Sequence, residues 1–362
     1  MKNEGQANSA ALEFAIDGKF IEATPYGSGH INDTYRVFFE KGDRRFCSIL
    51  QRINHNIFKK PVALMENVQR VTAHLAAVVG DEPDSDRRVL RLIPTRDGRG
   101  WHVDAEGNYW RAYRFIENAT TYDAVESTDQ AFQAARAFGR FQKMLEGLPA
   151  SQLNETIPDF HNTPKRFSAL ERAIASDAAG RAASAKAEIE FAMAHEPITR
   201  VLLAANLPER VTHNDTKFNN VMLDDKTGEG ICVIDLDTVM PGLAPYDFGD
   251  MVRTTTSPVM EDERDLSKVT MQFPMFEALV RGYLSSAGGL LTNAEKELLA
   301  FSGKLITFEV GTRFLADYLS GDTYFKVHRE GHNLDRCRTQ FKLVTSIEQQ
   351  EDQMNRLVES LA

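Results

Sequence analysis

The stretch VTHNDTKFNNVMLDDKTGEGICVIDLDT, residues 211–238, decides the fold. It begins with a His-x-Asp-x-x-x-x-Asn loop made by His213, Asp215 and Asn220, and continues as two apolar runs separated by DDKTGEG. The Gly, Asp and Thr residues of this separator predict a hairpin turn. Pairing of the two runs as antiparallel strands would bring Asn220 and Asp235, which flank them, to the same end of the hairpin.

Three side chains of this hairpin have the chemistry that phosphoryl transfer requires. The acceptor hydroxyl must lie in line with the terminal phosphate of a nucleotide and lose its proton, while Mg²⁺ bridges the phosphates. We predict that Asp215 is the catalytic base, and that Asn220 and Asp235 are the Mg²⁺ ligands. Mg²⁺ usually takes one or two carboxylates together with water and substrate phosphates, so this small set is sufficient. His213 is expected to brace the loop, because kinases of this kind use a carboxylate as the base.

A second acidic motif follows in YDFGD, residues 246–250, which contains the D-F-G string of protein kinases. The segment MPG and Pro245 lie just ahead of it, so no strand is expected to lead into Asp247. The metal-binding aspartate should follow the second hairpin strand. We therefore select Asp235, and we expect Asp247 and Asp250 to brace the site or cap a helix.

Composition restricts the class of protein. The chain has 362 residues, of which 42% are hydrophobic, and no apolar stretch approaches the ~18 residues that a membrane span requires. The formal net charge of −10, with Lys and Arg scattered, argues against nucleic acid as a partner. Three widely spaced cysteines and a start without a signal-peptide pattern indicate a reducing compartment. We expect a cytoplasmic two-lobe protein without membrane attachment, either monomeric or a simple homo-oligomer.

Ahead of the catalytic stretch, the sequence predicts a small β lobe with a glycine-containing lid. A strand is expected over residues 21–26 and a returning strand over residues 34–39, with GSGHIND between them. Such a lid covers the phosphates in kinases, because glycine allows close approach of the backbone. The lid residues predicted to bind the nucleotide are Gly27, Ser28 and Gly29. The lid residues considered for acceptor contact are His30 and Asn32.

The expected third strand, residues 45–53, lacks the lysine that many kinases place on the nucleotide phosphates. Gln51 and Arg52 occupy the corresponding position, and alternation along a strand puts them on opposite faces. Only one of them can point into the cleft: Arg52 would keep the positive charge, whereas Gln51 lies in phase with Ile49. Both are candidates for nucleotide binding.

The pattern then changes from strands to helices, which divides the chain into two lobes. An apolar stripe over Pro61–Val79 predicts the single helix of the first lobe. The segment RFIEN, residues 114–118, shifts from strand to polar loop and is the expected interlobe hinge. The hinge residues predicted to bind the nucleotide, mainly through the backbone, are Phe115, Ile116 and Glu117. The predicted fold is α+β and protein kinase-like, with a small, mainly antiparallel β lobe (residues 1–113) and a larger helical lobe (residues 119–362).

Helices are expected over residues 128–148, 158–177, 183–207, 262–286, 292–319 and 340–360. One polar face of the fifth is formed by Glu309, Arg313, Asp317 and Tyr318. Two interpretations of this face stay open. It is either a surface with i,i+4 salt bridges or part of the cleft that recognises the acceptor.

Several segments, taken together, resemble the bacterial N-acetylhexosamine 1-kinases, a group within the aminoglycoside phosphotransferase and choline kinase-like family. The segments are PYGSGHINDTY, ILQRIN, YRFIE, RVTHNDTKFNN, VIDLDTVMPG, YDFGD, EDERDLSKV and RFLADYLSGDTYF. The resemblance extends over nearly the whole chain and includes segments outside the shared kinase core.

This resemblance implies a kinase-type fold and the ATP- and Mg²⁺-dependent phosphorylation of the anomeric hydroxyl of N-acetylglucosamine or N-acetylgalactosamine, a small-molecule sugar substrate. Asp215 matches the family's catalytic base, and Asn220 and Asp235 match its metal-side positions. The residues that match positions near the sugar-binding cleft are Thr238, Arg313, His30 and Asn32. The absent third-strand lysine departs from the broader family and leaves the phosphate contact open. Two other readings stay open: a phosphotransferase for choline, an aminoglycoside or another small hydroxyl acceptor, and a regulatory pseudokinase that binds nucleotide.

Overall fold

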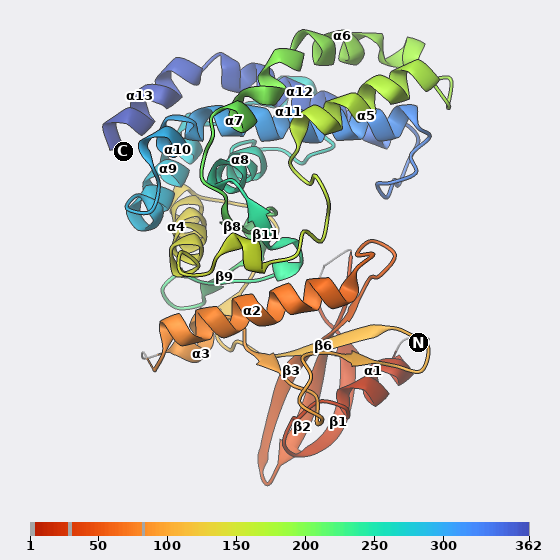
Figure 1. Cartoon of the computed structure of the whole chain (residues 1–362), viewed down its shortest axis with the longest axis vertical. Coiled ribbons are helices and arrows are strands. Elements are labelled where there is room, and N and C mark those ends of the chain that lie inside the picture. Colours follow the sequence, from red (N-terminus) through yellow and green to blue (C-terminus); the bar gives the residue numbers. More distant parts are fainter. Residues whose placement is uncertain (1–3, 28–30, 82–83, 362) are drawn as a thin grey trace.

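The computed structural model of the chain describes residues 4–27, 31–81 and 84–361. Two lobes follow one another along the long axis, with strands in the N-terminal lobe and mainly helices in the C-terminal lobe (Figure 1). Helix α2 (Pro61–Val79) lies between the N-terminal sheet and the helical lobe. The fold is α+β and protein kinase-like, so the predicted fold class is confirmed.

An antiparallel sheet forms the N-terminal lobe. Its strands are β1 (Lys19–Pro25), β2 (Asp33–Lys41), β3 (Arg44–Ile53), β4 (Leu92–Ile93), β5 (His102–Val103) and β6 (Tyr109–Arg114). The strand order is β1-β2-β3-β6-β4, and β5 also pairs with β6. On the outer face, Tyr35, Leu50 and Trp110 pack in one cluster with the alanines of helix α1 (Glu4–Ala11). The inner face packs on α2 and therefore turns toward the C-terminal lobe.

Helix α2 covers the inner face of the sheet over the predicted span. Pro61 stands in its first turn, where an N–H has no intrahelical partner to lose. The side chain of Asn67, in the middle of the helix, donates to the carbonyls of Asn154 at 2.8 Å and Val239 at 3.1 Å. These bonds tie α2 to the C-terminal lobe. The apolar residues buried on the helix are Leu64, Met65, Val68, Val71, Leu75 and Val79.

Residues 115–118 lead from β6 to β7 (Ala119–Thr120), the first element of a small sheet of order β10-β9-β7. Strands β9 (Val221–Asp224) and β10 (Gly230–Val233) are antiparallel, and Val221 pairs with Val233. The N–H of Ile234 donates to the carbonyl of Asn220 at 2.9 Å. The predicted hairpin is confirmed, and its two polar ends meet. Strands β8 (Arg210–Thr212) and β11 (Met240–Gly242) form a further pair beside it.

Helices make up the rest of the C-terminal lobe (Figure 1). They are α4 (Thr128–Met144), α5 (Thr163–Ser176), α6 (Lys186–Ala194), α7 (Val201–Ala204), α8 (Ala244–Thr255), α9 (Phe273–Ala287), α10 (Asn293–Glu297), α11 (Leu299–Leu319), α12 (His332–Glu348) and α13 (Glu351–Leu361); the short α3 (Ser85–Arg88) belongs to the N-terminal lobe. Within the described ranges, none of the helices is both long and apolar enough to cross a membrane.

Several helices begin, end or break at other residues than the sequence predicts. The helix predicted over residues 183–207 is broken into α6 and α7 around Pro197, because proline lacks the N–H that continues the helix. The helix predicted over residues 262–286 begins only at Phe273, and the one predicted over residues 292–319 is interrupted at Leu298.

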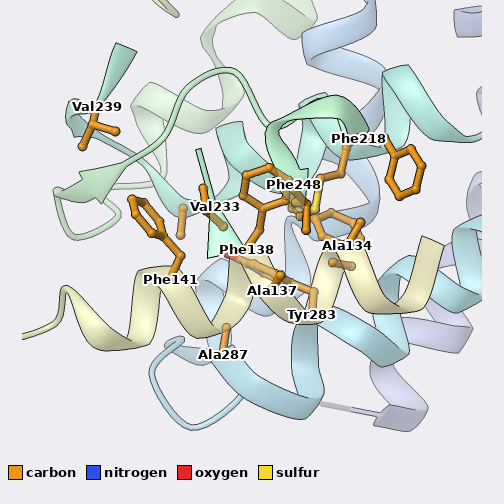
Figure 2. Packing of buried hydrophobic residues seen from close by; sticks show 14 of the residues in the cluster. Ala134, Ala137, Phe138, Phe141, Phe218, Val233, Val239, Phe248, Tyr283 and Ala287 are labelled. Atoms are coloured by element: carbon orange, nitrogen blue, oxygen red, sulfur yellow. The ribbon is translucent and has the colours of Figure 1, made fainter. Parts of the chain in front are cut away.

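A hydrophobic core holds the hairpin against the helices (Figure 2). It contains Phe138 and Phe141 of α4, Val233 of β10, Phe248 of α8 and Tyr283 of α9, all of them buried. Full burial of a large apolar side chain contributes about 1.5–3 kcal/mol. The polar residues at the end of the hairpin therefore rest on a rigid support.

Candidate active site

Asp247 of helix α8 holds the loop that carries Asp215. Its Oδ1 accepts the backbone N–H of Asn214 at 2.7 Å, and its Oδ2 accepts that of His213 at 2.9 Å. Gln142 of α4 donates a further bond to Oδ2 at 2.6 Å. Burial raises the pKa of Asp247, and both of its oxygens already accept hydrogen bonds inside the protein. The predicted bracing role of Asp247 is confirmed.

His213 is a second brace of the same loop, as predicted. Its Nε2 lies 2.9 Å from the carbonyl oxygen of Ile234, and its Nδ1 accepts the N–H of Asp215 at 3.3 Å. The rings of Phe138 and Phe141 pack edge-on against it, with centroid distances of 5.4 and 5.8 Å. Both nitrogens of this fully buried imidazole are engaged, so it is positioned to hold the loop.

Thr238, predicted near the acceptor, is also bonded to the loop. Its hydroxyl donates to the carbonyl of His213 at 2.7 Å. The amide of Asn214, a residue in the left-handed conformation with φ 64°, donates to the Thr238 carbonyl at 2.9 Å. An acceptor molecule would therefore meet Thr238 only through the lone pairs of its hydroxyl oxygen.

The carboxylate of Asp215 lies between an amide and an ammonium group. The Nδ2 of Asn220 donates to its Oδ2 at 3.2 Å and to its backbone carbonyl at 2.8 Å. The Nζ of Lys217 lies 3.0 Å from the same Oδ2. Burial is the largest single influence and acts to raise the pKa of Asp215, but Lys217, His213 and Arg253 together outweigh it, so the net shift is downward. Asp215 is therefore ionised at neutral pH and able to accept a proton.

Lys217 is a site residue that the sequence analysis missed. Burial is the largest single influence and acts to lower its pKa, but the carboxylates of Asp215, Asp235 and Asp250 together raise it more. The ammonium group is therefore held in its charged form beside Asp215, which it contacts at 3.0 Å. The feature of the sequence that could have indicated this role is that Lys217 lies two residues after Asp215, the predicted base.

Asp235 lies two residues after the end of β10 and adopts the left-handed conformation, with φ 59°. Its carboxylate has no hydrogen-bond or ion-pair partner within the described part of the chain. Burial, together with the neighbouring Asp237 and Asp215, raises its pKa to about 6. A carboxylate that lacks donors and faces two like charges is stabilised by a bound cation. The residues therefore fit Mg²⁺.

Asn220 would be the second ligand of that cation. Its Nδ2 is fixed on Asp215, and its Oδ1 accepts no hydrogen bond from any described residue. No group of three or more His, Cys, Asp and Glu in the described ranges is arranged to hold a metal by itself. One carboxylate and one amide oxygen leave room for phosphate oxygens and water, which Mg²⁺ prefers.

A buried ion pair joins the two lobes beside Asp235, and the sequence analysis missed both of its members. Arg111 of β6 donates to Oδ1 of Asp237, and the two side chains are 1% and 2% exposed. The other oxygen of Asp237 accepts from Nδ2 of Asn32 at 2.6 Å. Asn32 also accepts the N–H of Asn54 at 3.0 Å. Each polar end of Asn32 thus makes one hydrogen bond within the protein, and its contact with the acceptor stays a prediction.

Gln51 is the third-strand residue that faces Arg111 on the inner side of the sheet. Its Oε1 accepts from Nε of Arg111 at 3.0 Å, and its Nε2 donates to the hydroxyl of Thr34 at 3.0 Å. Arg52 lies on the opposite face, where its Nε donates to Asp33 at 2.8 Å. The prediction that Arg52 binds the nucleotide is therefore corrected, because strand alternation turns it away from the inner face.

The hinge meets the start of the lid through an aromatic contact. The rings of Phe115 and Tyr26 lie 6.1 Å apart, and the guanidinium of Arg36 lies over both, at 4.7 and 4.4 Å. The side chain of Ile116 is buried in the core, and the carbonyl of Glu117 accepts from Nε of Arg87 at 3.0 Å.

The lid itself is described only at its two ends. Gly27 has φ 81°, a conformation that favours glycine. The predicted contacts Ser28, Gly29 and His30 lie outside the described residues.

On the acceptor side, Arg313 of α11 makes no salt bridge with its helical neighbours. Its guanidinium lies 5.4 Å from the ring of Phe160 and 5.5 Å from that of Phe325, and no described residue pairs with it through a carboxylate. Asp317 instead accepts backbone N–H groups of the following loop, including that of Phe325 at 2.9 Å. The salt-bridge interpretation of this helix face is wrong.

Glu309, one turn before Arg313, connects α11 to the catalytic loop. Its carboxylate lies 2.8 Å from Nδ1 of His161, and Nε2 of the same ring lies 3.3 Å from the carbonyl of Asn214. Burial is the largest single influence and acts to raise the pKa of Glu309, but His161, Arg313 and Thr163 together lower it more. Arg313 is therefore one helical turn away from a residue that is linked to the loop of Asp215.

Comparison with known proteins agrees with this geometry. The sequence profile of the phosphotransferase enzyme family (APH) matches residues 22–267. An aminoglycoside phosphotransferase from Alicyclobacillus acidocaldarius has a similar structure, with a TM-score of 0.65, 10% identity, and coverage of 98% of this chain and 96% of that chain. A microcompartment-associated aminopropanol kinase gives a TM-score of 0.61 at 18% identity, covering 97% of this chain and 98% of that one.

A spectinomycin phosphotransferase, solved with ADP and spectinomycin, gives a TM-score of 0.55 at 15% identity, again covering 97% of this chain and 98% of that one. At these identities the likeness to solved structures shows a common fold over almost the whole chain.

Proposed function

Because the chain belongs to the phosphotransferase enzyme family, we propose that it transfers the terminal phosphoryl group of ATP to the anomeric (C1) hydroxyl of an N-acetylhexosamine. The products are the sugar 1-phosphate and ADP, and the acceptors are N-acetylglucosamine and N-acetylgalactosamine. The sequence resemblance supports this acceptor class, because it includes the α11 segment RFLADYLSGDTYF, outside the shared kinase core.

The observation that carries the acceptor class is the guanidinium of Arg313. It is flanked by the rings of Phe160 and Phe325 and has no carboxylate partner among the described residues. A cationic acceptor such as choline or an aminoglycoside is repelled by an unneutralised guanidinium. The hydroxyl and carbonyl oxygens of a neutral N-acetyl sugar accept its N–H groups instead.

Asp215 receives the proton of the acceptor hydroxyl. As the acceptor oxygen bonds to the γ-phosphorus, the bond from that phosphorus to the β–γ bridging oxygen breaks and ADP leaves. Asn220 and Lys217 hold the carboxylate of Asp215 in one orientation through the contacts at 3.2 and 3.0 Å. Because its pKa is lowered, the carboxylate of Asp215 is a weak base and takes the proton late in the reaction. Its larger contribution is therefore to orient the acceptor hydroxyl.

Asn220 and Asp235 would hold Mg²⁺ at the metal side of the site. When bound, Mg²⁺ would supply positive charge that offsets the negative charge of the phosphates. Asp247 and His213 keep the loop still during transfer, since both fix its backbone from the helical core. Lys217 is placed to offset the charge of the phosphoryl group, because its ammonium lies beside the proton acceptor.

An ADP-release assay over a panel of acceptors tests this proposal. The panel contains both N-acetylhexosamines, glucose, choline, an aminopropanol and an aminoglycoside, and phosphorus NMR locates the transferred group. We expect the highest kcat/KM for the N-acetylhexosamines, with the phosphate on C1. Faster turnover of choline, the aminopropanol or the aminoglycoside overturns the acceptor class. Nucleotide binding without turnover of any acceptor would identify a regulatory pseudokinase.

A further inference from the structure

Arg111 is the most deeply buried cation on the inner face of the N-terminal sheet. It stands on β6 directly opposite Gln51 of β3, in the register of the antiparallel pair. Gln51 occupies the position where the third strand lacks a lysine. A positive charge is therefore present in the same row of the sheet, one strand away.

Two of the nitrogens of this guanidinium are held by the protein. Its Nη1 donates to Asp237, and its Nε donates to Gln51 at 3.0 Å. Its Nη2 has no hydrogen-bond partner among the described residues. The side chain as a whole is 1% exposed, yet Nη2 is not among the fully enclosed unpaired atoms of the described residues, so it borders space that a ligand can reach. The unused donor therefore points to a ligand that is bound during function.

The surroundings of Arg111 indicate where that ligand lies. Asn32, at the end of the lid, bonds the same Asp237 carboxylate. Asp235, the predicted Mg²⁺ ligand, is two residues away from Asp237 in the sequence. Burial acts to lower the pKa of Arg111, but Asp237 and the nearby Asp235 both act to raise it. The guanidinium thus lies between the lid, the third strand and the metal-binding carboxylate.

We infer that Arg111 binds the phosphates of the nucleotide through Nη2, and so takes the part that a third-strand lysine plays in other kinases. The inference rests on the proposed function, because it places a nucleoside triphosphate between the lobes. Asp237 and Gln51 orient the guanidinium before the nucleotide arrives, so little side-chain freedom is lost on binding. The ion pair also spans the lobes, so phosphate contact and lobe position depend on the same group.

Binding of ATP and adenosine to the full chain, measured by titration calorimetry with Mg²⁺ and without acceptor, tests this inference. The critical variant is Arg111→Gln combined with Asp237→Asn, which replaces the buried ion pair by a neutral amide pair. Loss of one charge-assisted hydrogen bond should reduce the preference for ATP over adenosine by about 10- to 100-fold. Arg45→Gln is the matched control, since Arg45 is an ion-paired arginine of the same sheet that is 53% exposed. This control should keep the wild-type preference.

A purely structural role of Arg111 predicts a different pattern. The single variant Arg111→Gln would then bind both ligands weakly, because Asp237 is left buried without its partner. The double variant would recover the wild-type preference for ATP, and that recovery overturns the inference. Circular dichroism of each variant shows whether it is folded. If Arg111→Gln does not fold, the double variant alone tests the inference.

The assay separates this inference from the proposed function. It contains no sugar, so a wild-type preference for ATP that depends on Arg111 supports the inference even if another acceptor is the substrate. Conversely, turnover of N-acetylhexosamines together with an unchanged ATP preference in the double variant leaves the proposed function in place and overturns the inference.

Discussion

Replacement of Asp247 by alanine distinguishes a brace from a metal ligand in the D-F-G string. The carboxylate accepts the N–H groups of His213 and Asn214, and these residues are 0% and 4% exposed, so bulk water does not reach these donors in the intact protein. Leaving a buried donor unpaired costs about 1–3 kcal/mol, which gives about 2–6 kcal/mol for the two. Removal of a carboxylate whose pKa is raised by burial recovers part of this cost. We therefore expect Asp247→Ala to lose about 2–4 kcal/mol of the free energy of unfolding.

Urea denaturation followed by far-UV circular dichroism measures this loss, because the signal comes mainly from the helical lobe that contains Asp247. Activity should fall with it, since the loop of Asp215 loses its anchor. Asp43→Ala, at an exposed aspartate in the turn between β2 and β3, is the control and should stay within about 0.5 kcal/mol of wild type. Asp247→Ala with wild-type stability but an altered Mg²⁺ requirement would refute the reasoning and favour a metal ligand.

Four further outcomes are expected from the site. Asp215→Ala should lower kcat by about 10²–10⁴-fold with little change in ATP affinity, as measured by steady-state kinetics and calorimetry; a kcat within a factor of about three of wild type would remove Asp215 as the base. Lys217→Met should move the acidic limb of the pH–rate profile to higher pH, because the ammonium that lowers the pKa of Asp215 is gone; an unmoved limb would contradict this. The affinity for Mg²⁺ should fall about tenfold per pH unit below about pH 6, because the Asp235 carboxyl, with a pKa of about 6, must lose its proton to bind the cation. A titration of Mg²⁺ binding between about pH 5 and 8 measures this, and a flat profile argues against Asp235 as the ligand. Arg313→Met should reduce kcat/KM for the sugar by about 10- to 100-fold while the KM for ATP stays unchanged, and equal losses for both substrates would place Arg313 outside the acceptor site.

Much of the site scaffold could be predicted because its signals are local. The turn residues between the apolar runs and the pairing of those runs bring Asn220 and Asp235 together, as the register confirms. The span of α2 follows from Pro61 and an apolar stripe. In both cases the deciding interactions lie within a few residues of one another. The expectation that no strand leads toward the D-F-G string was wrong, because MPG forms strand β11 just ahead of α8. Asp247 is nevertheless a brace, because both of its oxygens accept hydrogen bonds from the protein.

Helix ends were less predictable, because periodicity alone does not determine where a helix stops. Apolar spacing continues through residues 292–319, yet the chain breaks at Leu298 between the capped α10 and the buried α11. The face of α11 shows the same limit. Spacing suggested salt bridges from Arg313, whereas packing gives Glu309 to His161 and Asp317 to the next loop.

The sequence by itself determined the chemistry of the catalytic loop and the class of fold, because turn propensity, strand alternation and helical stripes act between close neighbours. Only the tertiary structure decided which charges meet across the lobes. Arg111 and Asp237 are 126 residues apart, and Gln51 rather than Arg52 faces them. Such buried pairs form where two packed surfaces exclude water, and that condition depends on how whole elements are stacked rather than on any spacing along the chain.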